Sequence, residues 1–402
     1  MAEQIIENLP TSDLDMFKKQ VRSPNTEFKN MVQKNSSIQQ IKRNLVLSYP
    51  SDSTGCGHIR NIFPMNYLNS IFGKTGRFNL LLSPIMIFQD EILKRTRSIF
   101  FQRTMSPAQL PMVQKYKQMQ AKYKYKLVYD IDDFIWDGVE DGETIPEYNF
   151  GKKTIGKPVQ DACIEIMKLM DVVCVSTRFL GDYIASKGVE SKRIKVVHNT
   201  ISQAFWGVGK KQHITKRLEK PTVLWSASPT HWSNADRLAG DMDNAWQEWV
   251  IKSVLSNKIN FVQMGGLPWF FEPIKDKITV VPWVNSYQYH IAVKNVKADF
   301  GISPLVPNYF NYSKSAIKYQ EYCADGIVGI GTEFTNGKPS PYDICQIKAS
   351  DNITVKEIDD LFDKYCEPKN YNKILDAQYQ QLIESDWFTE SQGYVNKLIN
   401  IF

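Results

Sequence analysis

Hydrophobic and polar positions alternate in a regular way along this chain from residue 45 onwards. Short apolar runs bounded by turn-forming residues predict buried strands. Such runs occupy residues 45–49, 99–103, 127–136, 172–177, 194–199, 222–226, 260–266, 278–284, 300–304 and 327–331. Segments of helical spacing separate most of them, and alternation of this kind is typical of α/β folds. The pattern therefore predicts two doubly wound parallel sheets, one in each half of the chain.

The expected domain division follows from the length and from one polar stretch. At 402 residues the chain is too long for one ordinary core. Residues 207–221 are polar and basic and are typical of a linker, after which the alternation restarts. We therefore expect a polar extension at 1–40, domains at 41–215 and 216–384, and an amphipathic helix at 385–402.

One helical segment late in the chain carries most of the candidate chemistry. It follows a turn rich in Pro and Asn, and its spacing predicts a helix that begins near Ser313. Lys314 and Lys318 would project from one side of the helix start, where free N–H groups and the Ser315 hydroxyl favour a phosphate. Glu321, one turn further on, would accept hydrogen bonds from sugar hydroxyls. The alternative is a solvated lysine face with an ordinary Glu–Lys pair.

A glycine-containing turn follows the first predicted strand. Gly55-x-Gly57-x-x-Arg60 is a partial dinucleotide-binding fingerprint in which Arg60 stands where the third Gly would be. The glycines would let a ligand approach the backbone, and Arg60 would offer a planar fork to a phosphate. The alternative is a tight turn with Arg60 exposed.

Three carboxylates, those of Asp130, Asp132 and Asp133, lie in the run at 127–136. Ligands of parallel α/β sheets bind at the carboxyl ends of strands. Because close carboxylates repel one another, a cation or a hydroxyl-rich ligand would compensate them. Three interpretations are open: a metal site, a site for an acceptor hydroxyl or a general base, and a structural cap. No His lies nearby in the sequence, and the metal is the least favoured of the three. His198 follows another predicted strand, where a structural role is expected.

Charge is distributed unevenly along the chain, whose net charge is +6. Nine Lys or Arg residues (94, 95, 97, 103, 115, 117, 122, 124 and 126) fall in one stretch that has no Asp or Glu. Such a block is typical either of a solvated face or of a surface for nucleic acid or another anionic polymer. The candidate contacts to such an acceptor polymer are Arg103, Lys115, Lys122 and Lys124. The interleaved rings of Tyr116, Tyr123 and Tyr125 could stack on a nucleic-acid base.

Composition bounds the class of protein. With 43% hydrophobic and 23% charged residues, the chain is expected to be globular. No apolar run approaches the ~18 residues that span a bilayer, and the N-terminus lacks a signal-peptide pattern, so we expect no membrane insertion and a cytoplasmic location. Six Cys without a C-x-x-C pair indicate reduced thiols and no structural zinc site. Cys163 and Cys174, in apolar surroundings, are expected in the core.

Several short motifs resemble the retaining glycosyltransferases of the GT-B fold, in particular a phage and bacterial branch of them. In the first half they are Gly55-x-Gly57-x-x-Arg60-x-x-x-Pro64, Gln102-Arg103, Tyr129-Asp130-Ile131-Asp132-Asp133, Ile145-Pro146-Glu147-Tyr148, Val175-Ser176-Thr177 and Val197-His198-Asn199. In the second half they are Ser228-Pro229-Thr230-His231 and Asn311-x-x-Lys314-Ser315-x-x-Lys318-x-x-Glu321-Tyr322. The motifs occur in the expected order across roughly residues 45–335. The resemblance implies two Rossmann-like domains facing a central cleft, with the acceptor on the first and a nucleotide-sugar donor on the second.

The resemblance also implies roles for individual residues. Glu321 would hold the ribose hydroxyls, Lys318 the diphosphate, and the backbone at Trp283 the base. The full set of implied donor contacts is Gly57, Arg60, Ser228, Thr230, His231, Trp283, Val284, Ser315, Lys318 and Glu321.

Two departures from the family pattern concern the reacting groups. The usual pair of Glu residues seven apart is incomplete, because Lys314 replaces the first of them. The usual acceptor-side His is absent, and Asp130, Asp132 and Asp133 occupy its place. Front-face transfer without a base and an Asp role both remain open, with Asp132, Asp133 and Lys314 as the catalytic candidates and Asp130 as an acceptor contact.

The implied reaction releases a nucleoside diphosphate. Its charge would be stabilised by Lys314, Lys318, Arg60 and helix N–H groups, with no metal and no prosthetic group expected. The expected partners are a UDP-sugar and double-stranded DNA, whose 5-hydroxymethylcytosine would be glucosylated or arabinosylated after base flipping, in a host cytoplasm if the chain is phage-encoded. The alternatives are a transferase for a surface polysaccharide, lipid-linked glycan or protein, and a non-catalytic DNA-binding protein with a degenerate transferase fold.

Overall fold

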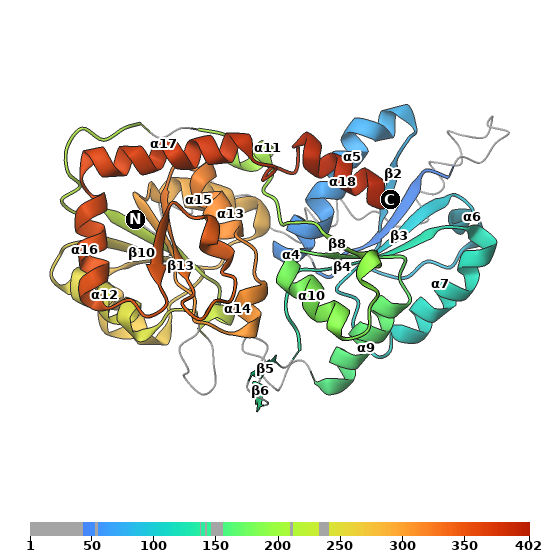
Figure 1. Cartoon of the computed structure of the whole chain (residues 1–402). Helices are drawn as coiled ribbons and strands as arrows, with labels where there is room; N and C mark the ends of the chain where they lie inside the picture. Colours follow the sequence, from blue (N-terminus) through green and yellow to red (C-terminus); the bar gives the residue numbers. More distant parts are fainter. Residues whose placement is uncertain are drawn as a thin grey trace. The chain divides into compact units, whose positions relative to one another are not determined.

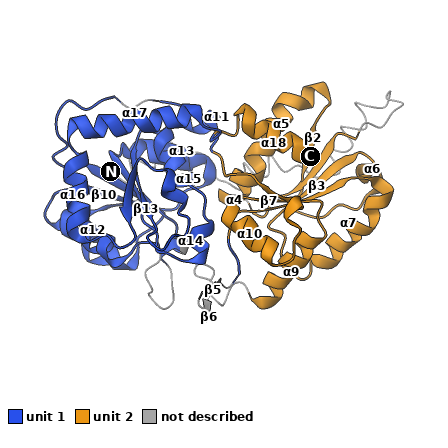
Figure 2. Ribbon diagram, viewed as in Figure 1, with its two compact units in different colours: residues 1–10, 134–154, 201–387 blue, residues 11–133, 155–200, 388–402 orange. Residues whose placement is uncertain are grey.

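The computed structural model describes residues 43–52, 55–136, 138–140, 143–145, 156–209, 212–232 and 241–402 (Figure 1). The predicted extension at 1–40 and the motif residues Pro146, Glu147 and Tyr148 lie outside these residues. Within the described part the chain forms two compact units (Figure 2). The N-terminal unit contains the described residues of 43–133, 156–200 and 388–402. The C-terminal unit contains residues 134–154 and 201–387.

The N-terminal unit is built on a six-stranded parallel sheet of order β2-β1-β3-β4-β7-β8. Its strands are β1 Leu45–Tyr49, β2 Asn79–Leu82, β3 Thr96–Gln102, β4 Lys126–Ile131, β7 Val172–Val175 and β8 Ile194–Val196. Its longer helices are α5 Phe63–Phe72, α7 Leu110–Tyr123, α9 Lys157–Lys168, α10 Arg178–Ser186 and α18 Gln392–Ile401. The strands are almost continuously apolar because helices cover both faces of the sheet.

The C-terminal helix packs on the N-terminal unit. Tyr394 and Leu398 of α18 join a buried cluster with Val46 and Phe100 of the sheet. Phe402 lies edge-on to Phe100, with ring centroids 5.5 Å apart. Within the stretch 385–402, α18 covers Gln392–Ile401 and completes the core of this unit.

The C-terminal unit repeats this architecture with the sheet order β11-β10-β9-β12-β13-β14, again all parallel. Its strands are β9 Thr222–Ser226, β10 Asn260–Met264, β11 Thr279–Val281, β12 Phe300–Ser303, β13 Val328–Glu333 and β14 Ile347–Ser350. Its longer helices are α12 Asn244–Leu255, α13 Ser286–Val296, α15 Ile317–Ala324, α16 Val355–Tyr365 and α17 Pro368–Glu384. A short antiparallel hairpin, β5 Gly138–Glu140 and β6 Glu143–Ile145, precedes it in the chain.

The two faces of this second sheet carry different helices. Trp225 and Phe300 point to a cluster with α12, α16 and the start of α17. Ser226 and Gly301, one position further along the same strands, point to the opposite face, where α13 and α15 pack. The prediction of two doubly wound parallel sheets is confirmed.

One predicted helix start is wrong. The helix expected from Ser313 is two helices, α14 Tyr309–Ser313 and α15, because Lys314 is extended (ψ 155°) and interrupts the helical path. In the N-terminal unit, α7 begins at Leu110, and Ser106 and Gln109 form a separate capped turn before it.

Candidate functional site

The residues around the start of α15 form a polar cluster inside the C-terminal unit. Lys314 lies in the break between α14 and α15, and its side chain is 16% exposed. Lys318 lies in the first turn of α15 and is partly buried. Burial, followed by the charge of Lys314, lowers the pKa of Lys318 to about 8. Ser315, between the two lysines, is also partly buried. Two neighbouring ammonium groups at a helix start favour the binding of an anion.

Glu321 lies one turn further along α15 and is buried. Its Oε2 accepts a hydrogen bond from the Tyr289 hydroxyl of α13 at 2.9 Å, and that hydroxyl is 2.7 Å from the hydroxyl of Ser226 at the end of β9. Burial raises the pKa of Glu321 to about 7, against the lowering effect of Tyr289 and Lys318. Its Oε1 has no hydrogen bond with a described residue, so this oxygen is available to a ligand hydroxyl.

Asp241 links the lysine to His231. Asp241 is 1% exposed, and its Oδ2 lies 2.7 Å from Lys314 Nζ and within hydrogen-bonding distance of His231 Nδ1. Burial acts to raise the pKa of Asp241, but Lys314 and His231 outweigh it, so the net pKa lies well below the ordinary value. Burial and the charge of Lys318 lower the pKa of His231 to about 4. The imidazole is therefore neutral near pH 7.

Sequence reasoning missed Asp241, Tyr289 and Ser226. Asp241 comes two residues before Asp243, which caps α12 by accepting a hydrogen bond from the Trp246 N–H, so a carboxylate there has the pattern of a helix start. Tyr289 lies within an ordinary amphipathic helix. No local signal marks either residue, because their roles arise from contacts between segments far apart in the chain.

The remaining predicted donor residues of this unit lie on loops that follow its strands. Ser228 precedes the short helix η4 Pro229–His231 after β9. Trp283 is 53% exposed and Val284 is half-buried after β11. The side chain of Thr230 lies outside the described residues. These loops share the carboxyl edge of the sheet with the Lys314 cluster.

Arg60 of the N-terminal unit is a buried structural anchor. Its Nε donates to Asp130 Oδ2 at 3.0 Å, its Nη2 pairs with the other oxygen of Asp130, and its Nη1 donates to Asn199 Oδ1 at 3.0 Å and to the Val197 carbonyl. The alternative of an exposed Arg60 is wrong. The guanidinium is also already occupied, so we exclude Arg60 from the donor site and Asp130 from the acceptor contacts.

Gly57 is required by the turn itself. The helix already begins at Gly55, and a Cβ at Gly57 would lie 1.9 Å from the Asp52 carbonyl oxygen. This close approach within the protein explains the glycine without a ligand.

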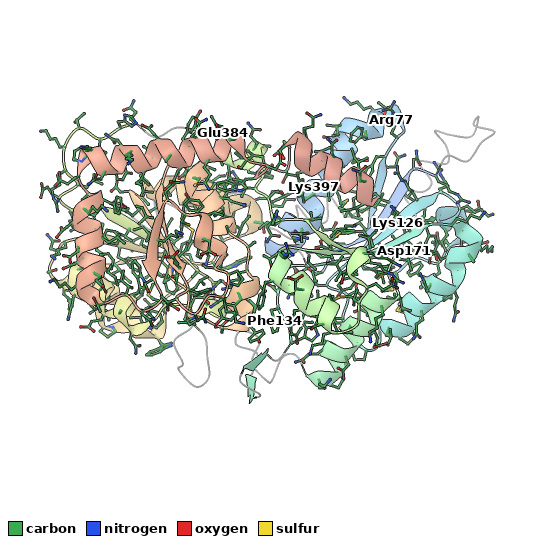
Figure 3. All side chains as sticks on the ribbon, in the orientation of Figure 1. Arg77, Lys126, Phe134, Asp171, Glu384 and Lys397 are labelled. Atoms are coloured by element: carbon green, nitrogen blue, oxygen red, sulfur yellow. The ribbon has the colours of Figure 1, made fainter. Side chains whose placement is uncertain are left out.

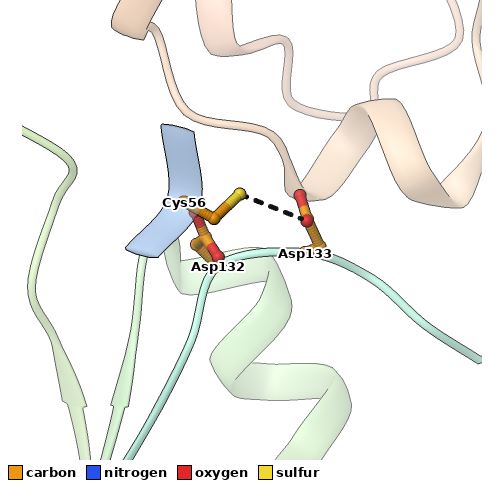
Figure 4. Close-up of side chains that lie close together, drawn as sticks. All are labelled: Cys56, Asp132 and Asp133. Carbon is orange, nitrogen blue, oxygen red and sulfur yellow. Dashed lines mark hydrogen bonds between the residues drawn. The ribbon is translucent and has the colours of Figure 1, made fainter. Parts of the chain in front are cut away.

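Asp132, Asp133 and Cys56 form a second polar cluster in the N-terminal unit (Figure 4). Their potential ligand atoms lie within 4.8 Å of one another. Asp133 Oδ2 pairs with Arg103 Nη1 at 2.9 Å and lies 3.9 Å from the Cys56 sulfur. Asp132 Oδ1 is buried and has no hydrogen-bond partner among the described residues. Burial, then the charge of Asp133, raises the pKa of Asp132 to about 7. The arrangement offers one unpaired, proton-accepting carboxylate oxygen.

The basic block is partly neutralised within the protein. Four of its cations pair with carboxylates: Lys94 with Glu91, Arg103 with Asp133, Lys117 with Asp171, and Lys122 with Asp90 (Figure 3 labels Asp171). Lys126, also labelled there, donates to the Ile401 carbonyl at 2.7 Å. The predicted stacking of Tyr116, Tyr123 and Tyr125 on a base is wrong, because all three rings are buried.

The remaining acceptor candidates are two exposed lysines. Lys115 Nζ lies 4.6 Å from the Phe88 ring centroid, and Lys124 lies at the end of α7.

His198 and the cysteines have structural surroundings. His198 Nδ1 lies 3.0 Å from the Ser176 carbonyl oxygen, as expected for a structural role. Cys163 and Cys174 are buried, and all six cysteines are free thiols. In the part of the chain that the structure describes, no helix has the length and apolar character needed to cross a membrane.

Comparison with known proteins identifies the fold. No protein-family model matches the sequence, and no curated protein matches it. Similar solved structures include a glycosyltransferase from Rickettsia africae, with 10% identity over 90% of this chain and 98% of that one and a TM-score of 0.55. The Anabaena protein HepE in complex with UDP and glucose has 7% identity over 89% and 98%, with a TM-score of 0.55. Sucrose-phosphate synthase from Thermosynechococcus elongatus has 9% identity over 90% and 98%, with a TM-score of 0.53. This chain thus has the two Rossmann-like sheets of the GT-B fold.

Proposed function

We propose that this protein is a glycosyltransferase that uses a UDP-sugar as donor. The observation that carries the proposal is the arrangement at the start of α15: Lys314 and Lys318 beside Glu321, whose Oε1 is available to a ligand. Two cations suit a diphosphate, and a buried carboxylate with one available oxygen suits a ribose hydroxyl. The fold shared with HepE, which was crystallised with UDP and glucose, adds support.

In this proposal the C-terminal unit holds the donor. Lys314, Lys318 and Ser315 contact the diphosphate, and Glu321 accepts a hydrogen bond from the ribose. The backbone at Trp283 and Val284 contacts the base, while Ser228, Thr230 and His231 complete the site from the loop after β9. The lysines and the helix N–H groups stabilise the departing UDP, so the chemistry is expected to proceed without a metal.

The acceptor is assigned to the N-terminal unit, with Asp132 as its central residue. Asp130 is held by Arg60, and Asp133 is paired with Arg103. Asp132 alone of the three has a buried oxygen without a described partner. Because the pKa of Asp132 is raised to about 7, this carboxylate can accept a proton from an attacking hydroxyl at neutral pH.

We propose that the acceptor is the hydroxymethyl group of 5-hydroxymethylcytosine in double-stranded DNA. The transfer would take place in the cytoplasm. The support is the resemblance described above together with the exposed Lys115 and Lys124. Transfer from a labelled UDP-sugar to hydroxymethylated DNA should fall as salt rises, because each phosphate contact releases counterions. Transfer that is insensitive to salt would contradict a DNA acceptor.

A second candidate acceptor is a hydroxyl of a polysaccharide, lipid-linked glycan or protein. The observation that favours it is the internal pairing of Lys94, Lys117 and Lys122, which reduces the charge available to DNA. Flotation with anionic liposomes would distinguish a lipid-linked acceptor, which predicts co-flotation, from DNA.

The donor is tested first, by thermal shift with nucleoside diphosphates and nucleotide sugars, with and without EDTA. A rise in Tm with uridine compounds that survives chelation is the expected result. If no nucleotide raises Tm, the chain is not a UDP-sugar transferase, and a non-catalytic DNA-binding protein becomes the better description.

A further inference from the structure

One buried carboxylate in the C-terminal unit has two partners and one spare oxygen. Asp241 Oδ2 contacts both Lys314 Nζ and His231 Nδ1. Its Oδ1 is buried with no hydrogen-bond partner among the described residues. Since Asp241 is 1% exposed, moving either partner away would leave a buried charge poorly compensated. The carboxylate therefore fixes the positions of the lysine and the imidazole together.

The contact with Asp241 determines which nitrogen of His231 carries the proton. An ionised carboxylate only accepts hydrogen bonds, so Nδ1 must be the donor. The imidazole is neutral near pH 7, which leaves Nε2 with a lone pair. Nε2 has no hydrogen bond with a described residue. A lone pair cannot bind a phosphate oxygen, but it can accept a hydrogen bond from a hydroxyl.

We infer that Asp241 is a positioning residue of the donor site, which holds Lys314 against the diphosphate and presents His231 Nε2 as an acceptor to a hydroxyl of the donor's sugar. The inference rests on the proposed function, because it requires a nucleotide sugar beside Lys314. It goes further by assigning recognition of the sugar to His231 of η4 and not to α15 alone.

The titratable groups around this carboxylate come from several elements. His231 belongs to η4, Lys314 and Lys318 flank the start of α15, and the buried phenol of Tyr342 belongs to η6 Pro341–Ile344. Glu321 acts on Lys318 from the next turn of α15. Asp241 and Glu321 favour the charged form of Lys318, while Lys314 opposes it.

The first test is the pH dependence of UDP affinity. In the wild type, affinity should fall as pH rises through about 8, where Lys318 loses its proton. Asp241→Asn should move this fall to lower pH by about one unit, because a carboxylate that favours the ammonium form is gone. Lys314→Met should move it to higher pH, because a neighbouring positive charge is gone. Asp241→Glu should restore part of the wild-type profile.

The second test compares UDP with the UDP-sugar that the wild type binds. His231→Phe should weaken UDP-sugar binding roughly five- to tenfold more than UDP binding, as expected for one lost hydrogen bond to the sugar. Asp241→Asn should reduce this preference for the UDP-sugar, because an amide can donate as well as accept and no longer fixes Nδ1 of His231 as the donor.

Asp243→Asn is the matched control. Asp243 lies two residues from Asp241 and caps α12, and Asn is an equally good cap, so the pH profile and the UDP-sugar preference should stay as in the wild type. If Asp241→Asn and Lys314→Met both keep the wild-type profile and preference, the inference is overturned while the proposed function stands. If Asp241→Asn does not fold, the upward shift in Lys314→Met and the altered preference in His231→Phe decide the matter. If the wild type binds no nucleotide, both fail.

Discussion

At the scale of single residues, the site combines groups whose burial works against their charge. Glu321 is the clearest case, because its carboxylate is buried with one hydroxyl donor, that of Tyr289. The pKa of this carboxyl is raised to about 7, above its ordinary value of 4.5. The folded state therefore binds the proton more tightly than the unfolded chain. The loss of folding stability caused by burying the ionised carboxylate is fully present above pH 7 and disappears as pH falls towards 4.5.

Glu321→Gln should accordingly raise the stability of the folded protein and lower its affinity for UDP. Gln is neutral at every pH, so the variant should be more stable than the wild type by on the order of 2 kcal/mol at pH 8, with a smaller difference at pH 5. UDP affinity should fall roughly ten- to hundredfold, because the charge-assisted hydrogen bond to the ribose is lost. Urea unfolding at the two pH values and calorimetric titration with UDP measure the two effects.

Glu384→Gln serves as the control for that prediction. Glu384 is an exposed carboxylate at the end of α17 in the same unit, and Figure 3 labels it. Its replacement should change neither stability nor UDP affinity measurably. A Glu321→Gln variant that is less stable than the wild type at pH 8 would mean that the carboxylate is needed for folding.

The sequence alone could identify candidate site residues that lie close to one another in the chain. Lys318 and Glu321 could be grouped because helical spacing relates them within α15, and Lys314 because it lies only four residues before Lys318. Asp241 could not be grouped with them, since it reaches Lys314 only through the folding of the sheet. The fate of Arg60 was equally hidden: its partners Asp130 and Asn199 are 70 and 139 residues away.

At the scale of elements, the position of α15 depends on how closely it approaches the sheet. A Cβ at Gly301 of β12 would lie 2.6 Å from a ring carbon of Tyr322, so only glycine permits this approach. Tyr322 is the neighbour of Glu321 in α15. The periodicity of the sequence predicted that this strand and this helix exist. It did not predict the close approach of α15 to the sheet or the break at Lys314, because both features depend on packing across the sheet.

Gly301→Ala should therefore affect binding as well as stability. The added methyl group must displace the Tyr322 ring, which should cost about 1–3 kcal/mol and shift the adjacent Glu321. Gly209→Ala, in the same unit, is the control, since a Cβ there would meet no atom within 4 Å. Chemical unfolding and UDP titration of both variants check the expectation. Equal behaviour of the two variants would show that α15 accommodates the methyl group without moving.

At the scale of the whole molecule, the chain builds two cores that are not simply successive in sequence. The strand pattern predicted both sheets, but it left open which unit would take up the last helix. The structure shows α18 within the N-terminal unit, where Leu398 is buried beside Val46 and Phe100. The spacing of apolar side chains predicted that α18 is amphipathic. It did not predict which sheet α18 packs against, because that depends on which sheet surface the other helices leave uncovered.

This division predicts that a ligand and a core mutation will act on different parts of the molecule. UDP contacts only the C-terminal unit in our proposal, so at a hundredfold excess over Kd it should stabilise that unit by about 2.7 kcal/mol. Leu398→Ala removes buried contacts from α18 and should destabilise the N-terminal unit by about 2–4 kcal/mol, whereas Asn396→Ala, on the exposed face of α18, should have little effect. Because the two sites belong to different units, the shifts should be independent: calorimetry should resolve a transition raised by UDP and another lowered by Leu398→Ala, each unchanged by the other. A single transition on which both act together would mean that the two cores unfold as one, and the gain from UDP would then offset the loss at α18.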